Sequence, residues 1–192
     1  MSRIVFIDTE VEPKTEKVSD YGAVDFLRDK IHTNSEAEFA EFISENKFIC
    51  GHNILAHDLK YISEAVEKSG AEFAVDTLYL SSLLFPQRPY HALLKDDKLR
   101  TDELNNPLND ALKAMELFYD EVNAFDDLDE AFKDIFCGLL YPQKEFYGFF
   151  EYIKRVPKGD TAQLIREIFD GKICENCDID ALAKNYPIEL AY

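Results

Sequence analysis

Two acidic residues, Asp8 and Glu10, directly follow the apolar run IVFI at residues 4–7. A run of β-branched and aromatic residues predicts a short strand that is buried on both faces. Side chains two positions apart in a strand point to the same face, so the two carboxylates are expected side by side. Adjacent carboxylates repel each other unless a cation lies between them, so the pair predicts a metal site. Taken alone, an Asp-x-Glu pair is also common at the end of an ordinary strand.

Two further acids stand where they could join this pair. Asp58 opens a predicted helix just after a predicted buried strand, although an ordinary helix N-cap is the favoured explanation for an isolated Asp there. Asp110 lies near the start of a long amphipathic helix, on a flank shared with Ala114 and Leu117. An acid on a mostly apolar flank needs a partner, which is either a metal ion or a buried salt bridge.

Strand and helix patterns alternate around these acids. Strands are expected at residues 4–7, 21–26, 30–32, 48–51 and 73–78, and helices at residues 36–46, 57–69 and 108–122. Residues 11–20 are expected to form a loop or a wide hairpin connection, and residues 86–106 an irregular segment. Three adjacent strands followed by helix–strand alternation predict an α/β fold, with a mixed five-stranded sheet flanked by helices.

The character of the chain changes after residue 124. A cluster of acids is followed by an aromatic-rich stretch and by further helical patterns up to residue 190. The sequence therefore predicts a core domain at residues 1–124 and a helical extension, or linker towards a further domain, at residues 125–192. Cys174 and Cys177 have the spacing of half a zinc knuckle, but without a second pair nearby they are interpreted as structural or incidental.

The composition limits the partners of the protein. The 192 residues include 38 acidic and 21 basic side chains, which give a formal charge of −17. Such a surface opposes a large nucleic-acid footprint, but it leaves room for an enzyme that admits one strand end into a metal-filled cleft. We expect no membrane partner and no secretory signal, and the scattered cysteines favour reduced thiols and a cytoplasmic location.

In this order and spacing the acidic motifs resemble the DEDD family of 3′-to-5′ exonucleases, within the ribonuclease-H-like superfamily. The first family motif matches VFIDTE at residues 5–10, and the second matches GHN at residues 51–53, which leads to Asp58. The third motif matches NPLNDA at residues 106–111. The resemblance covers about residues 3–124.

The resemblance implies a ribonuclease-H-like fold and a site that holds two Mg²⁺ or Mn²⁺ ions. The acids implied as metal ligands and catalytic residues are Asp8, Glu10, Asp58 and Asp110. The implied substrate is the 3′ end of a single-stranded nucleic acid, DNA in preference to RNA, released as nucleoside monophosphates. The chain is also similar to domains that precede helicases in bacterial proteins, which implies a helicase domain in the same full-length polypeptide.

The third motif departs from the family pattern at its general base. The family normally carries a His five residues before the final Asp or a Tyr four residues before it, whereas this chain has Asn105 and Asn106 there. An amide does not accept a proton near neutral pH, so Asn105 would at most orient a water. His91 is the substitute that we consider first, with His52 and His57 as further options.

Four other residues are expected to contact the substrate. Arg88 and Lys95 belong to the one locally basic stretch of the sequence, beside aromatic residues such as Tyr90. Cations next to aromatic rings suit backbone contact and base stacking, although solvated loop charges explain the stretch equally well. Thr9 and Asn53, inside the first two motifs, are the other two expected contacts.

Two other functions remain open on the sequence alone. The missing base favours a catalytically weakened exonuclease-fold module that binds nucleic acid or protein, whereas the four acids favour catalysis. The acidic surface would also suit a small-molecule phosphoesterase of the same fold. The chain has no Gly-rich phosphate loop of the kind that an ATPase requires.

Overall fold

The structure is a computed structural model, which describes residues 3–93 and 106–192. Its strands are β1 (Ile4–Glu12), β2 (Lys17–Asp25), β3 (Lys30–Thr33), β4 (Phe48–Gly51) and β5 (Phe73–Asp76). Its helices are α1 (Glu36–Ile43), α2 (Leu59–Ser69), α3 (Thr77–Leu84), α4 (Pro107–Asp126), α5 (Glu130–Leu140), α6 (Lys144–Ile153), α7 (Thr161–Ile168), α8 (Ile179–Asn185) and α9 (Pro187–Ala191). None of the described helices is both long and apolar enough to cross a lipid bilayer.

The strands form one mixed sheet in the order β3-β2-β1-β4-β5. Neighbours among β1, β2 and β3 pair antiparallel, whereas β4 is parallel to β1 and β5 is parallel to β4. This confirms the predicted α/β fold with a mixed five-stranded sheet, and it is compatible with a ribonuclease-H-like fold. The carboxyl ends of β1, β4 and β5 consequently meet at one edge of the sheet.

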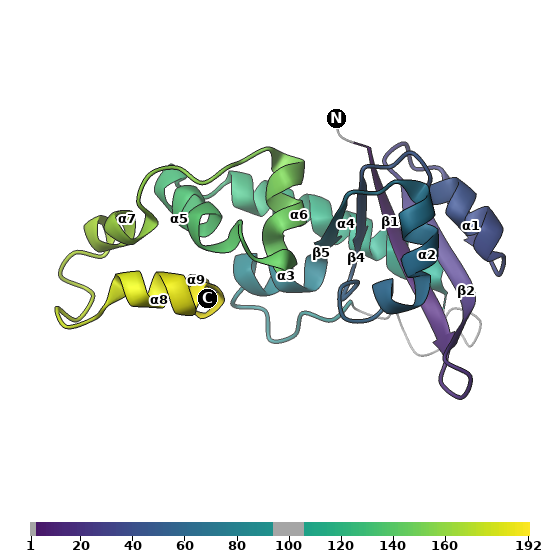
Figure 1. Cartoon of the computed structure of the whole chain (residues 1–192), viewed down its shortest axis with the longest axis horizontal. Coiled ribbons are helices and arrows are strands. Elements are labelled where there is room, and N and C mark those ends of the chain that lie inside the picture. Colours follow the sequence, from purple (N-terminus) through teal and green to yellow (C-terminus); the bar gives the residue numbers. More distant parts are fainter. Residues whose placement is uncertain (1–2, 94–105) are drawn as a thin grey trace.

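Helices cover both faces of the sheet (Figure 1). Alternate residues of β1 enter two separate cores, because side chains alternate across a strand. Ile4 and Phe6 face α4, and the rings of Phe6 and Phe118 lie 5.5 Å apart. Val5 and Ile7 face α1 and α2 in the second core.

The first hairpin is longer than expected. Residues 11–20 were expected to be a connection, but β1 continues to Glu12 and β2 already begins at Lys17, its cross-strand partner. The ladder shifts register between Glu10 and Val11. The extension is polar, so it lacks the hydrophobic alternation that reveals a strand, and opposite charges directly across from each other favour the pairing.

The fifth strand is shorter than expected, because a helix replaces its end. The strand predicted at residues 73–78 stops at Asp76, and α3, which was not predicted, begins at the next residue. The Asp76 carboxylate accepts a hydrogen bond of 2.9 Å from the N–H of Leu78, which caps this helix. Smaller differences occur elsewhere: the helix expected at residues 36–46 ends at Ile43, and α2 begins at Leu59.

The C-terminal part of the chain is helical, as predicted, and one of its helices packs against the sheet. Helix α4 runs through the expected boundary at residue 124 to Asp126, and α6 lies on β5. The ring of Phe149 in α6 lies 5.4 Å from that of Phe125 and 6.5 Å from that of Phe118. One apolar core therefore crosses the expected boundary, and the division into two domains stays a prediction.

Candidate metal centre

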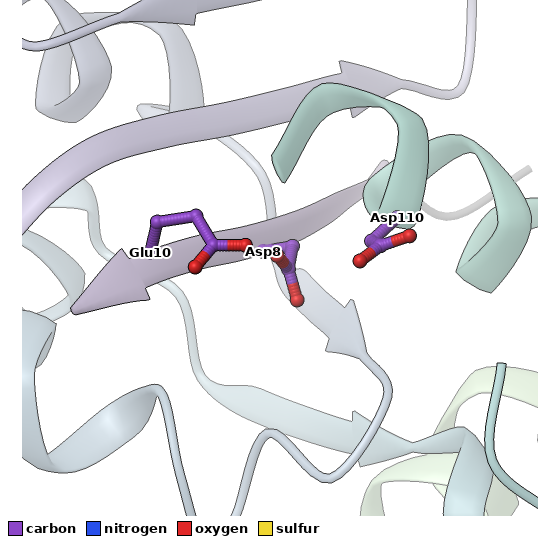
Figure 2. A group of neighbouring side chains, drawn as sticks. All are labelled: Asp8, Glu10 and Asp110. Atoms are coloured by element: carbon purple, nitrogen blue, oxygen red, sulfur yellow. The ribbon is translucent and has the colours of Figure 1, made fainter. Parts of the chain in front are cut away.

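Three carboxylates meet near the carboxyl end of β1 (Figure 2). Asp8 and Glu10 belong to β1, and Asp110 lies in the first turn of α4. Each residue offers a carboxylate oxygen, and these oxygens lie within 4.8 Å of one another. All three residues are half-buried. The structure thus brings together three of the four acids that the motifs singled out.

The alternation of β1 explains why Asp8 and Glu10 share a face. They continue the row of Ile4 and Phe6, which is buried beneath α4. The pairing of β1 with β4 runs from Ile4 to Phe6, so the two acids extend beyond the end of the parallel ladder. They therefore stand at the sheet edge where α/β proteins usually bind ligands.

Gly22 allows the start of α4 to approach the sheet beside the two acids. It is the cross-strand partner of Asp8, and a Cβ atom placed on it would lie 2.1 Å from the backbone nitrogen of Leu108. The helix start is fixed by Asn106, whose side-chain oxygen accepts the N–H of Leu108 at 3.0 Å. Asp110 follows within one turn, where the helix dipole favours a carboxylate. The position of Asp110 therefore depends on the absence of a side chain at Gly22.

The donor set of this cluster fits a hard divalent cation. Carboxylate oxygens suit Mg²⁺ and Mn²⁺, whereas zinc would recruit His or Cys. Carboxylates this close repel one another, and a cation between them removes the repulsion. Within residues 3–93 and 106–192, no other group of three or more His, Cys, Asp or Glu residues has its ligand atoms as close.

Asp58, the fourth predicted acid, faces Thr9 and lies outside this cluster. The residue is 1% exposed, and its Oδ1 accepts hydrogen bonds from the Thr9 N–H at 3.0 Å and the Thr9 hydroxyl at 2.6 Å. Burial raises the pKa of the Asp58 carboxyl, and the bonds from Thr9 and the charge of His57 oppose that rise. Asp58 thus holds the strand residue between Asp8 and Glu10, and its role as a metal ligand stays a prediction.

Asp76, which the sequence predicted only as part of a strand, organises the second motif. Its Oδ1 accepts the N–H of Asn53 at 2.9 Å, and its Oδ2 accepts the N–H of Leu55 at 3.1 Å. Asn53 has a left-handed backbone with φ of 63°, which turns the chain towards Asp58. Burial raises the pKa of Asp76. An Asp between an apolar strand and a helix-forming run was the available signal, because it is a helix-cap pattern.

Two of the candidate bases are engaged with hydroxyl groups. His52 Nδ1 lies 2.9 Å from the Thr77 hydroxyl, and His91 Nδ1 lies 2.9 Å from the Ser81 hydroxyl. Burial, assisted by the neighbouring His91, lowers the pKa of His52 to about 4, so His52 is neutral at pH 7. His57 is exposed. The role of His91 as the base stays a prediction, and Asn105 and Lys95 lie outside the described residues.

A pocket of about 580 Å³ lies between the segment after α3 and helix α4. Arg88, Tyr90 and His91 line one wall, and Lys113 and Glu116 line the other. The guanidinium of Arg88 lies 3.8 Å from the centre of the Phe85 ring, which restrains it by a cation–π contact. Tyr90 is 81% exposed. Lys113 is three residues after Asp110 in α4, but none of the three clustered acids is among the lining residues of this pocket.

Known proteins of similar sequence or structure give little direct indication of function. No protein-family model matches the chain, and a search among curated proteins finds no match either. A search of solved structures finds similarity to a family B DNA polymerase from the hyperthermophilic archaeon Pyrobaculum calidifontis, at 15% identity and a TM-score of 0.37. The similarity covers 77% of this chain and 26% of the polymerase chain.

Proposed function

We propose that this chain is a metal-dependent 3′-to-5′ exonuclease of the DEDD type, which removes nucleotides from single-stranded 3′ ends, DNA in preference to RNA. The observation that carries the proposal is the cluster of Asp8, Glu10 and Asp110 at the carboxyl edge of a mixed five-stranded sheet. Two acids on a strand and a third on a helix start are what the motif resemblance implies. A helicase domain in the same polypeptide is proposed from that resemblance alone.

The residues of the chain have distinct roles in this proposal. Asp8, Glu10 and Asp110 would hold Mg²⁺ or Mn²⁺, with Asp58 as the fourth acid of a two-ion site. Such cations stabilise the charge that develops on a phosphodiester and lower the pKa of the attacking water. The hydrogen bonds that Thr9 donates to Asp58 fix the strand between Asp8 and Glu10, so the two carboxylates need little rearrangement on binding.

The pocket lined by Arg88 and Lys113 would supply contacts for the strand. Arg88 and Lys113 would approach backbone phosphates, and the exposed ring of Tyr90 would stack on a base. The formal charge of −17 keeps the rest of the strand away from the surface. With two phosphate contacts, the logarithm of the binding constant should fall against the logarithm of salt concentration with a slope of only about −1.4.

A binding module with weakened chemistry is the second candidate. It is favoured by His91, which is half-buried with Nδ1 against Ser81, and by Asn106, whose side chain already caps α4. The bond to Ser81 leaves only Nε2 of His91 to accept a proton, and the amide of Asn106 cannot serve as a base. The two candidates differ in turnover, whereas both predict binding of a strand.

The decisive experiment follows a 5′-labelled single-stranded DNA with Mg²⁺, Mn²⁺ or Ca²⁺. We expect a ladder of shortened products with Mg²⁺ and Mn²⁺ and none with Ca²⁺. Removing a residue that only supports a metal ligand commonly lowers metal affinity or activity by roughly 10–100-fold. Loss of a ligand itself, in Asp8→Asn or Asp110→Asn, should therefore lower the rate by at least about 10²-fold. The matched control is Asp126→Asn, the same change at an exposed position at the other end of α4.

Melting curves with and without Mn²⁺ provide the second measurement. Mn²⁺ should raise the melting temperature of the wild type and of Asp126→Asn, but hardly that of Asp8→Asn, because a cation that binds the native state stabilises it. Strand binding without products would favour the binding module, and turnover of dinucleotides alone would favour a phosphoesterase. Equal Mn²⁺ shifts in all variants would show that the ion binds elsewhere.

A further inference from the structure

A pair of cysteines occupies the turn between α7 and α8, at the far end of the molecule from β1 (Figure 1). The N–H of Cys177 donates to the carbonyl of Cys174 at 2.9 Å, which closes a four-residue turn. Both thiols are free, and Cys174 is exposed whereas Cys177 is half-buried. This pair takes no part in the proposed nuclease chemistry, so any chemistry of the two thiols is independent of that function.

The turn brings the two cysteines within reach of a covalent bond. The ends of a β-turn lie less than about 7 Å apart between Cα atoms. Disulfides join residues whose Cα atoms are about 4.4–6.8 Å apart, so a closed turn puts the two Cα atoms in or near this range. A hollow of about 340 Å³, lined by both cysteines together with Arg166, Asp170 and Ile179, gives a small reagent access to them.

A metal site accounts for the pair less well than a disulfide does. Structural zinc requires four ligands, of which the two thiols supply half. Among the described residues, no His, Asp or Glu combines with Cys174 and Cys177 into a group of three close ligand atoms. The chemistry that the pair can perform without further ligands is dithiol oxidation.

The other two cysteines are protected, which makes the pair distinctive. Cys50 is buried in the sheet, and burial raises its pKa well above the ordinary value. Cys137 is buried in α5 against the carbonyl of Arg155, and burial raises its pKa to about 11. Since the thiolate is the reactive form, both thiols should be inert in the native protein.

We propose that Cys174 and Cys177 form a reversible disulfide by exchange with a small-molecule disulfide such as oxidised glutathione. The exposed Cys174 thiolate attacks one sulfur of the reagent, which forms a mixed disulfide and releases one glutathione thiolate. Cys177 then loses its proton and its sulfur attacks Cys174, which releases the second glutathione thiolate. The two thiol protons of the protein end on the two glutathione molecules, so one disulfide is reduced for each disulfide formed.

Closing this disulfide would fix the connection between two helices. Arg166 of α7 pairs with Asp180 of α8, and Ile179 at the start of α8 is buried. The same connection includes Phe169 and Ile173, which line an apolar hollow of about 290 Å³ beside α5 and α9. The covalent link would therefore reduce the motion of one wall of this hollow while leaving the carboxylate cluster unchanged.

The test equilibrates the native chain with oxidised and reduced glutathione at several ratios, stops the exchange with acid, unfolds the protein, blocks the remaining thiols by alkylation, and records intact and peptide masses. We expect the oxidised chain to lose two of its four alkylations, both from the peptide that contains Cys174 and Cys177. Reduction should restore them. Cys177→Ser should instead accumulate a stable glutathione adduct on Cys174, and Cys174→Ser should react more slowly, at the less exposed Cys177.

Three results would overturn the proposal. The first is a glutathione adduct that persists on Cys174 in the wild type, because it would mean that Cys177 cannot reach it. The second is oxidation that produces only disulfides between chains. The third is the retention of all four alkylations at every glutathione ratio.

Discussion

Gly22→Ala should disable the carboxylate cluster without changing any acid. Gly22 lies opposite Asp8 in the β1–β2 ladder, and the start of α4 rests on it. The added Cβ would lie 2.1 Å from the nitrogen of Leu108 and 2.2 Å from the carbonyl carbon of Pro107. These are backbone atoms, so no flexible side chain can turn aside, and the helix start itself must move.

The size of the displacement follows from the contact distances. Ordinary contact of a Cβ begins at 3.4 Å, so a separation of 2.1 Å requires a shift of about 1.3 Å. Asp110 lies in the same first turn as Leu108 and would move with it, away from Asp8 and Glu10. A misplacement of about 1 Å in a catalytic site can cost roughly 10²-fold in rate, and overpacking of this kind costs about 1–3 kcal/mol of stability.

The assay combines Mn²⁺ titration calorimetry, the single-strand degradation rate and thermal melting. Gly22→Ala should remain folded but bind Mn²⁺ weakly and degrade DNA roughly 10²-fold more slowly. The matched control is Gly148→Ala, in which the new Cβ would lie 2.0 Å from the carbonyl oxygen of Ala74. That clash is equally severe, but it separates α6 from β5 and leaves the carboxylates in place.

The two variants together distinguish a local effect from a general one. Wild-type Mn²⁺ affinity in Gly22→Ala would refute the claim that this glycine positions Asp110. An equal loss of affinity in Gly148→Ala would show that general destabilisation, and not the position of one helix, controls the site.

Two further predictions concern buried polar groups. Both carboxyl oxygens of Glu121 are buried without a hydrogen-bond partner among the described residues, and burial raises the pKa of this group from 4.5 to about 10. Between those values the unfolded chain releases a proton that the native state retains, so stability falls as pH rises. Glu121→Gln removes this dependence. In urea unfolding, the free energy of unfolding of the variant should exceed that of the wild type, and the difference should grow by up to about 1.4 kcal/mol per pH unit between pH 5 and 9. Thr9→Val removes the hydroxyl that donates to the buried Asp58 and should cost about 1–3 kcal/mol in urea unfolding, whereas Thr9→Ser should retain most of the stability.

Local sequence patterns were sufficient to predict the order of most strands and helices. They also predicted that two of the site residues, Asp8 and Glu10, lie on the same face of a strand. The alternation of apolar residues before Asp8 predicts both the strand and the shared face of Asp8 and Glu10. The capping pattern at Ser35 predicts α1, and its hydroxyl accepts the N–H of Glu38. These features depend on a few neighbouring residues, and for that reason a single sequence reveals them.

Local patterns failed where side-chain hydrogen bonds outweighed hydrophobic periodicity. The helix α3 begins because Asp76 caps it, although the preceding apolar run suggested that the strand would continue. The same carboxylate binds the N–H groups of Asn53 and Leu55, more than 20 residues earlier in the chain. No local pattern contains that information, because the partners meet only after β4 and β5 have paired.

The composition of the candidate site was decided by tertiary packing. Asp110 joins Asp8 and Glu10 because Gly22 has no side chain to keep α4 away from the sheet. The Asp58 carboxylate accepts hydrogen bonds from Thr9, and its role as a fourth metal ligand stays a prediction. The sequence by itself determined which residues could bind a cation. The packing of helices on the two faces of the sheet determined which of them meet, because each strand residue faces only one side.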